Sequence, residues 1–203
     1  QLPFTQQGDV TVVPLPLAPE DAKLVVFRTP VSAGGPSGFI GNGPAPQTLP
    51  VTGAWTVEFQ PGRGAPTRIE MAALQPLNEH GNAGVKYFSG VATYTMNFVP
   101  PKKAKLGALL WLDLGKVGDV AEVRVNGKLA GTVWLAPNRV DIGSLVKRGS
   151  NSLEVRVANL WVNRLIGDRQ PGAEKIGFVA APTYKPDAPL RPSGLIGPVR
   201  LEY

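Results

Sequence analysis

Glycine and proline recur throughout this chain and limit what it can fold into more than any other feature. Glycine occupies 24 and proline 21 of the 203 positions, roughly double their share in an average protein. Proline removes a backbone donor and clashes with the preceding helical turn, and glycine weakens a helix interior. The sequence therefore argues against an all-α bundle and favours short segments joined by turns.

The chain has no cysteine and a single histidine, His80. Disulfides, thiol nucleophiles and zinc sites built on cysteine or on several histidines are therefore excluded. His80 lies in a polar turn with no nucleophile suggested nearby, so we expect an exposed loop residue and not a general base. We expect no cofactor.

The net charge is +6, which is compatible with a nucleic-acid partner. The densest basic group, Lys102, Lys103 and Lys105, follows two prolines in an expected turn and has no RNA-binding or DNA-binding motif beside it. We therefore expect a solvated basic surface and no nucleic-acid partner. No apolar stretch approaches the roughly 20 residues that span a bilayer, so we expect no membrane partner.

The chain divides into three parts by composition. Residues 1–29 contain two short β-rich runs, Val10–Leu17 and Ala22–Arg28, and resemble the β-hairpin-like remnant of a preceding β domain. Residues 30–50 are rich in glycine and proline and carry no charge, which predicts a linker. Residues 51–203 are long enough to form one domain with its own core.

Residues 51–203 repeatedly show the two-residue alternation of half-buried strands. Trp55 shares one face with other apolar residues and is expected in the core, as is Trp111, which lies in an apolar run expected to be buried on both faces. Asn126-Gly127 predicts a type I′ hairpin turn. The expected strands are Trp55–Gln60, Val91–Phe98, Ala108–Leu114, Ala121–Val125, Lys128–Trp134, Arg139–Ile142, Ser152–Ala158 and Pro198–Tyr203. These short strands predict an all-β fold, an antiparallel β-sandwich or jelly roll with an N-terminal β extension.

The stretch from Val125 to Val157 resembles a known domain type. It combines the Asn126-Gly127 turn with Asp141, suited to cap a short helical turn, and with Gly149 before the next core strand. This arrangement is similar to the sugar-binding jelly roll of family-2 glycoside hydrolases, which has the galactose-binding-domain-like fold.

Five further segments narrow the resemblance to the C-terminal jelly roll of family-106 glycoside hydrolases, the α-L-rhamnosidases. They are Lys86–Gly90, Ala92–Tyr94, Leu112–Gly115, Asn159–Asp168 and Pro192–Val199. The combination is specific, whereas each motif alone would be weak. The two runs in residues 1–29 also resemble the last strands of the domain that precedes this jelly roll in those enzymes.

The resemblance implies a non-catalytic domain that binds glycan or braces a catalytic domain of the same polypeptide. In these enzymes two carboxylates hydrolyse the glycosidic bond from a separate barrel, for which this chain has no room. The implied partners are that catalytic domain and a carbohydrate, either rhamnose-containing or a plant or bacterial polysaccharide. The implied location is secreted or periplasmic, and we expect no signal peptide within these residues, because the first ones lack a basic segment followed by an apolar one. Alternatives are a stand-alone carbohydrate-binding or adhesin module and a small polysaccharide-active enzyme.

A first group of candidate carbohydrate-binding residues follows the strand Ser152–Ala158. The Trp161 ring can stack on a sugar, and Asn163, Arg164 and Asp168 can bond its hydroxyls. The same residues have a structural interpretation. Trp161 would then pack the loop, and Arg164 and Asp168 would hold it through an ion pair and backbone contacts.

A second group comprises Trp134, Asn138 and Arg139, at a strand end and in its loop. Such loops can form a ligand face, or Trp134 can simply close the edge of the sandwich. Tyr87 is a further candidate, as a platform for a sugar or as a contact with a preceding domain.

A structural calcium ion is common in sugar-binding jelly rolls, which makes calcium the metal that the resemblance suggests. Calcium needs six to eight oxygen ligands, whereas the aspartates of the domain are scattered along the sequence. They are Asp113, Asp119, Asp141 and Asp168. We therefore expect no metal site.

Overall fold

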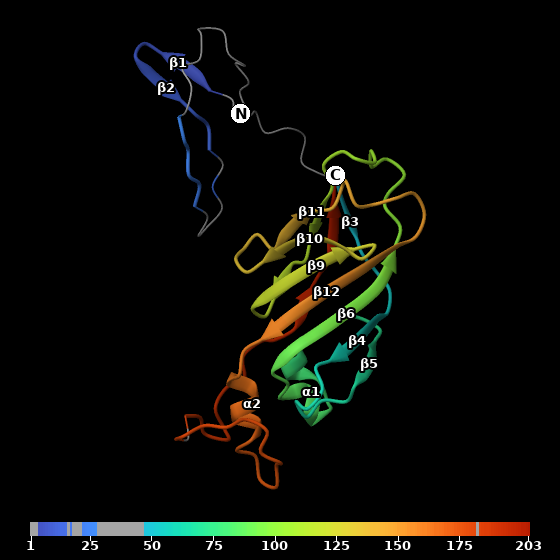
Figure 1. Ribbon diagram of the computed structural model, residues 1–203, viewed down its shortest axis with the longest axis vertical. Coiled ribbons are helices and arrows are strands. Elements are labelled where there is room, and N and C mark those ends of the chain that lie inside the picture. The colour runs from blue at the N-terminus through green and yellow to red at the C-terminus, as the bar shows by residue number, and fades with distance from the viewer. Residues whose placement is uncertain (1–3, 16, 18–21, 28–46, 182) are drawn as a thin grey trace. The chain divides into compact units, whose positions relative to one another are not determined.

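A computed structural model describes residues 4–15, 17, 22–27, 47–181 and 183–203, which belong to two compact units (Figure 1). The units are Gln1–Gln47 and Thr48–Tyr203. In the first, β1 (Thr5–Gln7) pairs antiparallel with β2 (Val10–Val12). This hairpin begins closer to the N-terminus than the two β-rich runs expected from the sequence. Residues 22–27, in the second of those runs, form no strand. Pro14 lacks an N–H donor, which limits the extension of β2. Most of the expected linker falls outside the described residues.

The second unit is built on a six-stranded antiparallel sheet with the order β10-β9-β12-β6-β4-β5. Its strands are β10 (Lys128–Val133), β9 (Val120–Val125), β12 (Asn151–Asn159), β6 (Gly90–Phe98), β4 (Trp55–Phe59) and β5 (Arg68–Met71). All but β5 correspond to strands expected from the alternation of the sequence.

A four-stranded antiparallel sheet lies behind the first in Figure 1, with the order β11-β7-β14-β3. It comprises β11 (Arg139–Asp141), β7 (Trp111–Asp113), β14 (Arg200–Glu202) and β3 (Thr48–Pro50). A small pair, β8 (Lys116–Val117) and β13 (Leu195–Gly197), completes the β structure of this unit in the described residues. The predicted antiparallel β-sandwich is confirmed. The sequence assigned β3 to the linker, but it pairs with β14.

The helices are short, as the density of glycine and proline requires. They are η1 (Leu77–Glu79), α1 (Ala83–Lys86) and α2 (Val162–Gly167). The sequence predicted an irregular segment where α2 forms. None of these helices has the length and apolar character needed to cross a bilayer, a finding that covers the described residues only.

The core lies between the two large sheets. Trp55 meets Tyr94 edge-on at 6.5 Å between ring centroids, and Phe59 meets Phe88 in the same way at 4.8 Å. The inward positions of β9 and β12 are almost completely buried. Trp55 is thus a core residue, as expected.

The apolar run around β7 is buried on one face only, which corrects the sequence-based expectation. Leu110, Leu112 and Leu114 are buried, whereas Leu109 is 60% exposed. Trp111 is half-buried on the outer face, with the Arg139 guanidinium 4.8 Å from its ring centroid. Because no further layer covers this sheet within the described residues of the second unit, the strand alternates like its neighbours.

Two buried asparagines hold the ends of β12. The Asn151 carboxamide accepts hydrogen bonds from Asn126 Nδ2 and the Lys147 N–H, both at 2.8 Å. Asn159 Nδ2 donates to the Gly90 carbonyl at 3.1 Å, and its Oδ1 accepts from the Gly194 N–H at 2.7 Å. The Asn126-Gly127 turn has positive φ angles of 51° and 76°, as a type I′ turn requires.

The hydroxyl of Tyr94 is buried and forms no hydrogen bond of good geometry within the described residues. Burial raises the pKa of Tyr94, and the Leu195 backbone offsets this only in part. Gly194 lies against the hydroxyl with a φ of 83°. A side chain at position 194 would therefore be strained and would overlap the phenol.

We expect Tyr94→Phe to leave the free energy of unfolding within about 1 kcal/mol of the wild type, because the hydroxyl brings no strong hydrogen bond. Gly194→Ala should cost more than about 2 kcal/mol, and adding Tyr94→Phe should recover part of that loss. Urea unfolding followed by fluorescence measures all three. A loss above about 2 kcal/mol for Tyr94→Phe alone would show that the hydroxyl has a partner.

Candidate functional site

The α2 helix carries a buried ion pair that holds the loop after it. Arg164 Nε lies 2.8 Å from Asp168 Oδ1, and both side chains are more than nine-tenths buried. Asp168 also accepts hydrogen bonds from the backbone N–H groups of Ile176 at 3.2 Å and Gly177 at 2.6 Å. The carboxylate thus joins the helix to the middle of its following loop.

Two more side chains fasten the same loop. Asn163 Oδ1 accepts from the Arg191 N–H at 2.8 Å, and Asn163 Nδ2 donates to the Arg191 carbonyl at 2.8 Å. Gln170 Nε2 donates to the Pro186 carbonyl at 2.8 Å. We refer to residues 160–181 and 183–193, which include α2, as the α2 module (Figure 1). Its buried polar side chains bond to the protein itself.

The aromatic candidates near α2 are partly covered. Tyr87 is half-buried and packs under Gly167, where a Cβ atom would collide with its ring. Trp161 is 42% exposed, and the Arg63 guanidinium lies 4.6 Å from its ring centroid. One face of Trp161 is therefore already occupied by a cation.

The second candidate group combines one exposed ring with two bonded polar side chains. Trp134 is 71% exposed. Asn138 Nδ2 donates to the Gly115 carbonyl at 3.0 Å, and Arg139 pairs with Glu202 at 3.4 Å. Trp134 is thus the member of this group that can offer a free surface.

Both candidate groups lie at the same end of the sandwich. Asn138 contacts Gly115, and the chain continues from there through β8 to Asp119. Asp119 accepts from the Leu160 N–H at 3.1 Å and from Arg191 Nη2 at 3.2 Å. The structure therefore brings together loops that are distant in sequence, with the 115–119 segment between the two groups.

The aspartates considered for calcium have other roles in the described structure. Asp113 Oδ1 accepts from the Gly115 N–H at 2.9 Å, and Asp141 Oδ1 accepts from the Gly143 N–H at 2.9 Å, which caps the following turn. No group of three or more acidic or histidine residues is placed to hold a metal ion in the part of the chain described. His80 Nδ1 accepts from the backbone N–H of Asn82 at 3.1 Å.

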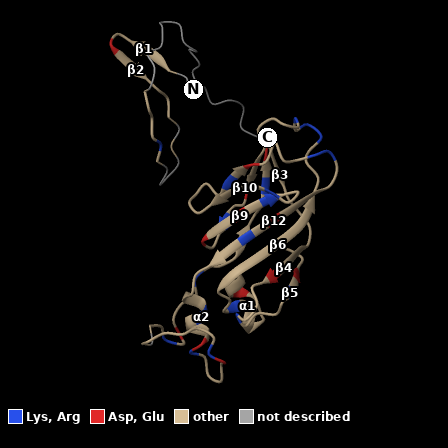
Figure 2. Ribbon diagram, viewed as in Figure 1, with Lys and Arg blue, Asp and Glu red and all other residues tan. Residues whose placement is uncertain are grey.

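The outer face of the six-stranded sheet carries charged side chains in cross-strand rows. Glu122 pairs with Arg124 at 2.9 Å and with Arg156 at 3.6 Å, and Arg124 lies 3.9 Å from Glu154. Figure 2 shows basic residues on β9 and β12 and acidic residues on β4 and β5. Opposite charges face each other across the strands, which favours this register.

At the other edge of that face, Glu70 accepts hydrogen bonds from Arg68 at 2.8 Å and from the Thr56 hydroxyl at 3.0 Å. These hydrogen bonds lower the pKa of Glu70, and the bond from Arg68 has the largest effect.

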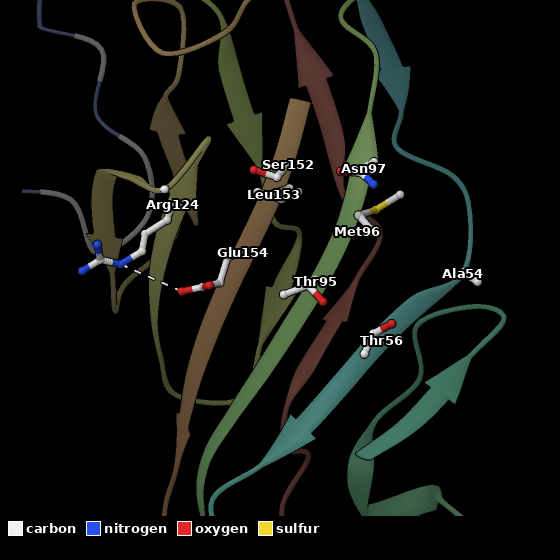
Figure 3. A pocket seen from close by; sticks show the side chains of 10 residues that line it. Ala54, Thr56, Thr95, Met96, Asn97, Arg124, Ser152, Leu153 and Glu154 are labelled. Atoms are coloured by element: carbon white, nitrogen blue, oxygen red, sulfur yellow. Dashed lines mark ion pairs between the residues drawn. The ribbon is translucent and has the colours of Figure 1, made fainter. Parts of the chain in front are cut away.

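A hollow of about 440 Å³ lies on this face between the charged groups (Figure 3). The side chains of Thr95, Asn97 and Ser152 have no hydrogen-bonding partner among the described residues. The hollow is lined by Ala54, Thr56, Thr95, Met96, Asn97, Arg124, Gly127, Ser152, Leu153 and Glu154. It was not predicted from the sequence, although the outward positions of the expected strands already carried small polar residues.

Comparisons with known proteins place the chain beside parts of large glycosidases. It is 53% identical to the structure of a rhamnosidase from Novosphingobium sp. PP1Y, with a TM-score of 0.87, over 99% of this chain and 19% of that one. A protein of Formosa agariphila provisionally named a beta-glucuronidase is 37% identical, over 77% of this chain and 16% of its own length. No protein-family model matches the chain.

A more distant likeness concerns the fold alone. A beta-glucuronidase from an uncultured Clostridium sp. is 20% identical, with a TM-score of 0.54, over 87% of this chain and 30% of that one. The chain thus spans less than a third of each of these proteins. It is a β-sandwich domain that matches one part of a rhamnosidase.

Breaking the α2 ion pair should destabilise the protein strongly. We expect Asp168→Ala to cost about 3–5 kcal/mol, because it leaves the Arg164 charge buried and unpaired. Arg156→Gln breaks an exposed pair with Glu122 and should cost about 1 kcal/mol or less. Urea unfolding measures both, and trypsin cleavage at Lys175 and Lys185 should accelerate in Asp168→Ala only. Equal stability of the two variants would contradict the structural role of the pair.

Proposed function

We propose that this chain is a non-catalytic accessory domain of a glycoside hydrolase resembling the family-106 α-L-rhamnosidases. In this proposal it has the galactose-binding-like type of jelly roll and belongs to a secreted or periplasmic polypeptide. The observation that carries the proposal is the 53% identity with a rhamnosidase over 99% of this chain, which spans only 19% of that protein. Most of such an enzyme would lie outside the domain.

The use of the buried carboxylate supports a non-catalytic role. Catalytic acids in glycosidases face the scissile bond in a pair. Asp168, buried beside Arg164, bonds inward to the ion pair and to two backbone N–H groups. Asp113, Asp119 and Asp141 likewise accept backbone hydrogen bonds. These four carboxylates therefore hold loops in place through hydrogen bonds within the protein.

Bracing of a neighbouring domain is the role that the α2 module supports best. Its buried polar side chains bond inward, while four apolar side chains are exposed: Phe178 is 94% exposed, and Leu160, Trp161 and Val179 are also exposed. Holding a loop rigidly while exposing apolar groups is a typical arrangement of an interaction surface. We refer to these four residues as the apolar patch.

Carbohydrate binding is the second candidate function, and it is supported by Trp134. An exposed indole ring can stack on the apolar face of a sugar. This role would suit either an accessory domain or a stand-alone module.

A double substitution in the apolar patch tests the bracing role. Trp161→Ser with Phe178→Ser should lower the melting temperature of the complete gene product by several degrees, since a covered apolar contact is lost. The same substitutions should leave the isolated 203-residue chain nearly unchanged, because the patch is exposed there. Leu129→Ser, at an exposed position on β10, is the matched control. Differential scanning calorimetry of both proteins gives the comparison.

Two outcomes would contradict the proposal separately. A complete gene product that does not hydrolyse 4-nitrophenyl α-L-rhamnopyranoside would oppose the assignment to a rhamnosidase-like enzyme. Equal melting temperatures for the patch variant and the Leu129→Ser control would oppose bracing through the patch alone.

A further inference from the structure

We propose that the hollow on the outer face of the six-stranded sheet binds a neutral sugar residue. This inference rests on the second function proposed above, carbohydrate binding, and assigns it to a site remote from the α2 module. None of the residues predicted from the sequence to contact carbohydrate lines this hollow.

The hollow has the size and construction of a small-molecule site. Its volume of about 440 Å³ lies within the range of about 300–1,000 Å³ found for such sites. Its walls come from β4, β6, β9 and β12 together with the turn at Gly127 (Figure 3). Because β6 and β12 pair along nine residues, the positions of these walls are fixed by the register of the sheet.

The lining offers unused hydrogen-bonding groups. Thr95 and Asn97 project from β6, and Ser152 lies opposite Asn97 on β12. Two hydroxyls and a carboxamide can each donate and accept, as the vicinal hydroxyls of a sugar also do. These three side chains have no hydrogen-bonding partner among the described residues, so a ligand would displace water from them without breaking bonds within the protein.

The same hollow has an apolar part. Ala54 and the half-buried Met96 border it, whereas the Leu153 side chain, 1% exposed, faces the core and offers a ligand no surface. Gly53 leaves room for Met96, since a Cβ atom at position 53 would lie 3.3 Å from the methionine methyl carbon. A sugar ring presents C–H groups on one face and hydroxyls at its edge, so this mixed lining matches its chemistry. A flexible methionine can adapt to such a surface.

The charges around the hollow favour a neutral ligand. Arg124 is paired with Glu122 at 2.9 Å and lies 3.9 Å from Glu154. Glu70, which bonds to Thr56 at the edge, is paired with Arg68 at 2.8 Å. A phosphate or a nucleic acid would need cations that are not already paired.

Titration of the full 203-residue chain with L-rhamnose and with D-galactose, followed by amide NMR shifts, tests the site. We expect saturable shifts centred on Thr95, Asn97 and Ser152 for at least one of the two sugars. Asn97→Ala combined with Ser152→Ala should weaken binding at least tenfold. Thr95→Val should also weaken it, whereas Thr93→Val, one row away on the same face of β6, should stay within twofold. Unchanged melting temperatures would verify the folding of each variant.

Three outcomes would overturn the inference. Absence of saturable shifts up to about 50 mM sugar, a concentration that detects even binding weaker than the millimolar range, would oppose the hollow and carbohydrate binding together, and would leave bracing intact. Shifts centred on Trp134 or Trp161 would oppose the hollow but support carbohydrate binding elsewhere. Binding of D-glucuronate at least tenfold tighter than either neutral sugar would contradict the preference for an uncharged ligand.

Discussion

The register of β12 is the constraint on which the rest of the sandwich depends. This strand is hydrogen-bonded to β6 on one side and β9 on the other, and each end is held by a buried asparagine, Asn151 or Asn159. A slip of one residue would turn the apolar face of the strand toward solvent and would also leave both carboxamides buried without partners. An incorrect register therefore costs free energy in two ways, through the exposed apolar residues and through the unpaired carboxamides.

The two faces of the domain use polar groups in opposite ways. At the α2 module, Asn163, Arg164 and Asp168 are buried and consumed by internal bonds, which fixes the shape of a loop more than it adds stability. On the outer sheet face, Thr95 and Ser152 remain available to a ligand. A polar residue type is therefore a weak guide to binding here, because burial decides whether its bonds are already satisfied.

Local patterns predicted the strands well but did not indicate the hollow on the outer sheet face. The alternation in Trp55–Phe59 and Ser152–Ala158 and the Asn126-Gly127 turn follow from short-range rules. The short strand β5 was not predicted because four residues show too little periodicity. Helix α2 was not predicted because it has no side-chain cap and its anchors lie far along the chain. The hollow needs residues from four strands, so its lining can be assembled only once the register is known.

The position of β14 has a consequence for how the domain is made. This strand lies between β7 and β3 in the four-stranded sheet, although β3 begins at Thr48 and β14 begins at Arg200. During synthesis β3 therefore has no neighbour in its sheet until about 150 residues later, when β14 leaves the ribosome. Pairings of such long range fold slowly, so one side of the core stays open on the nascent chain.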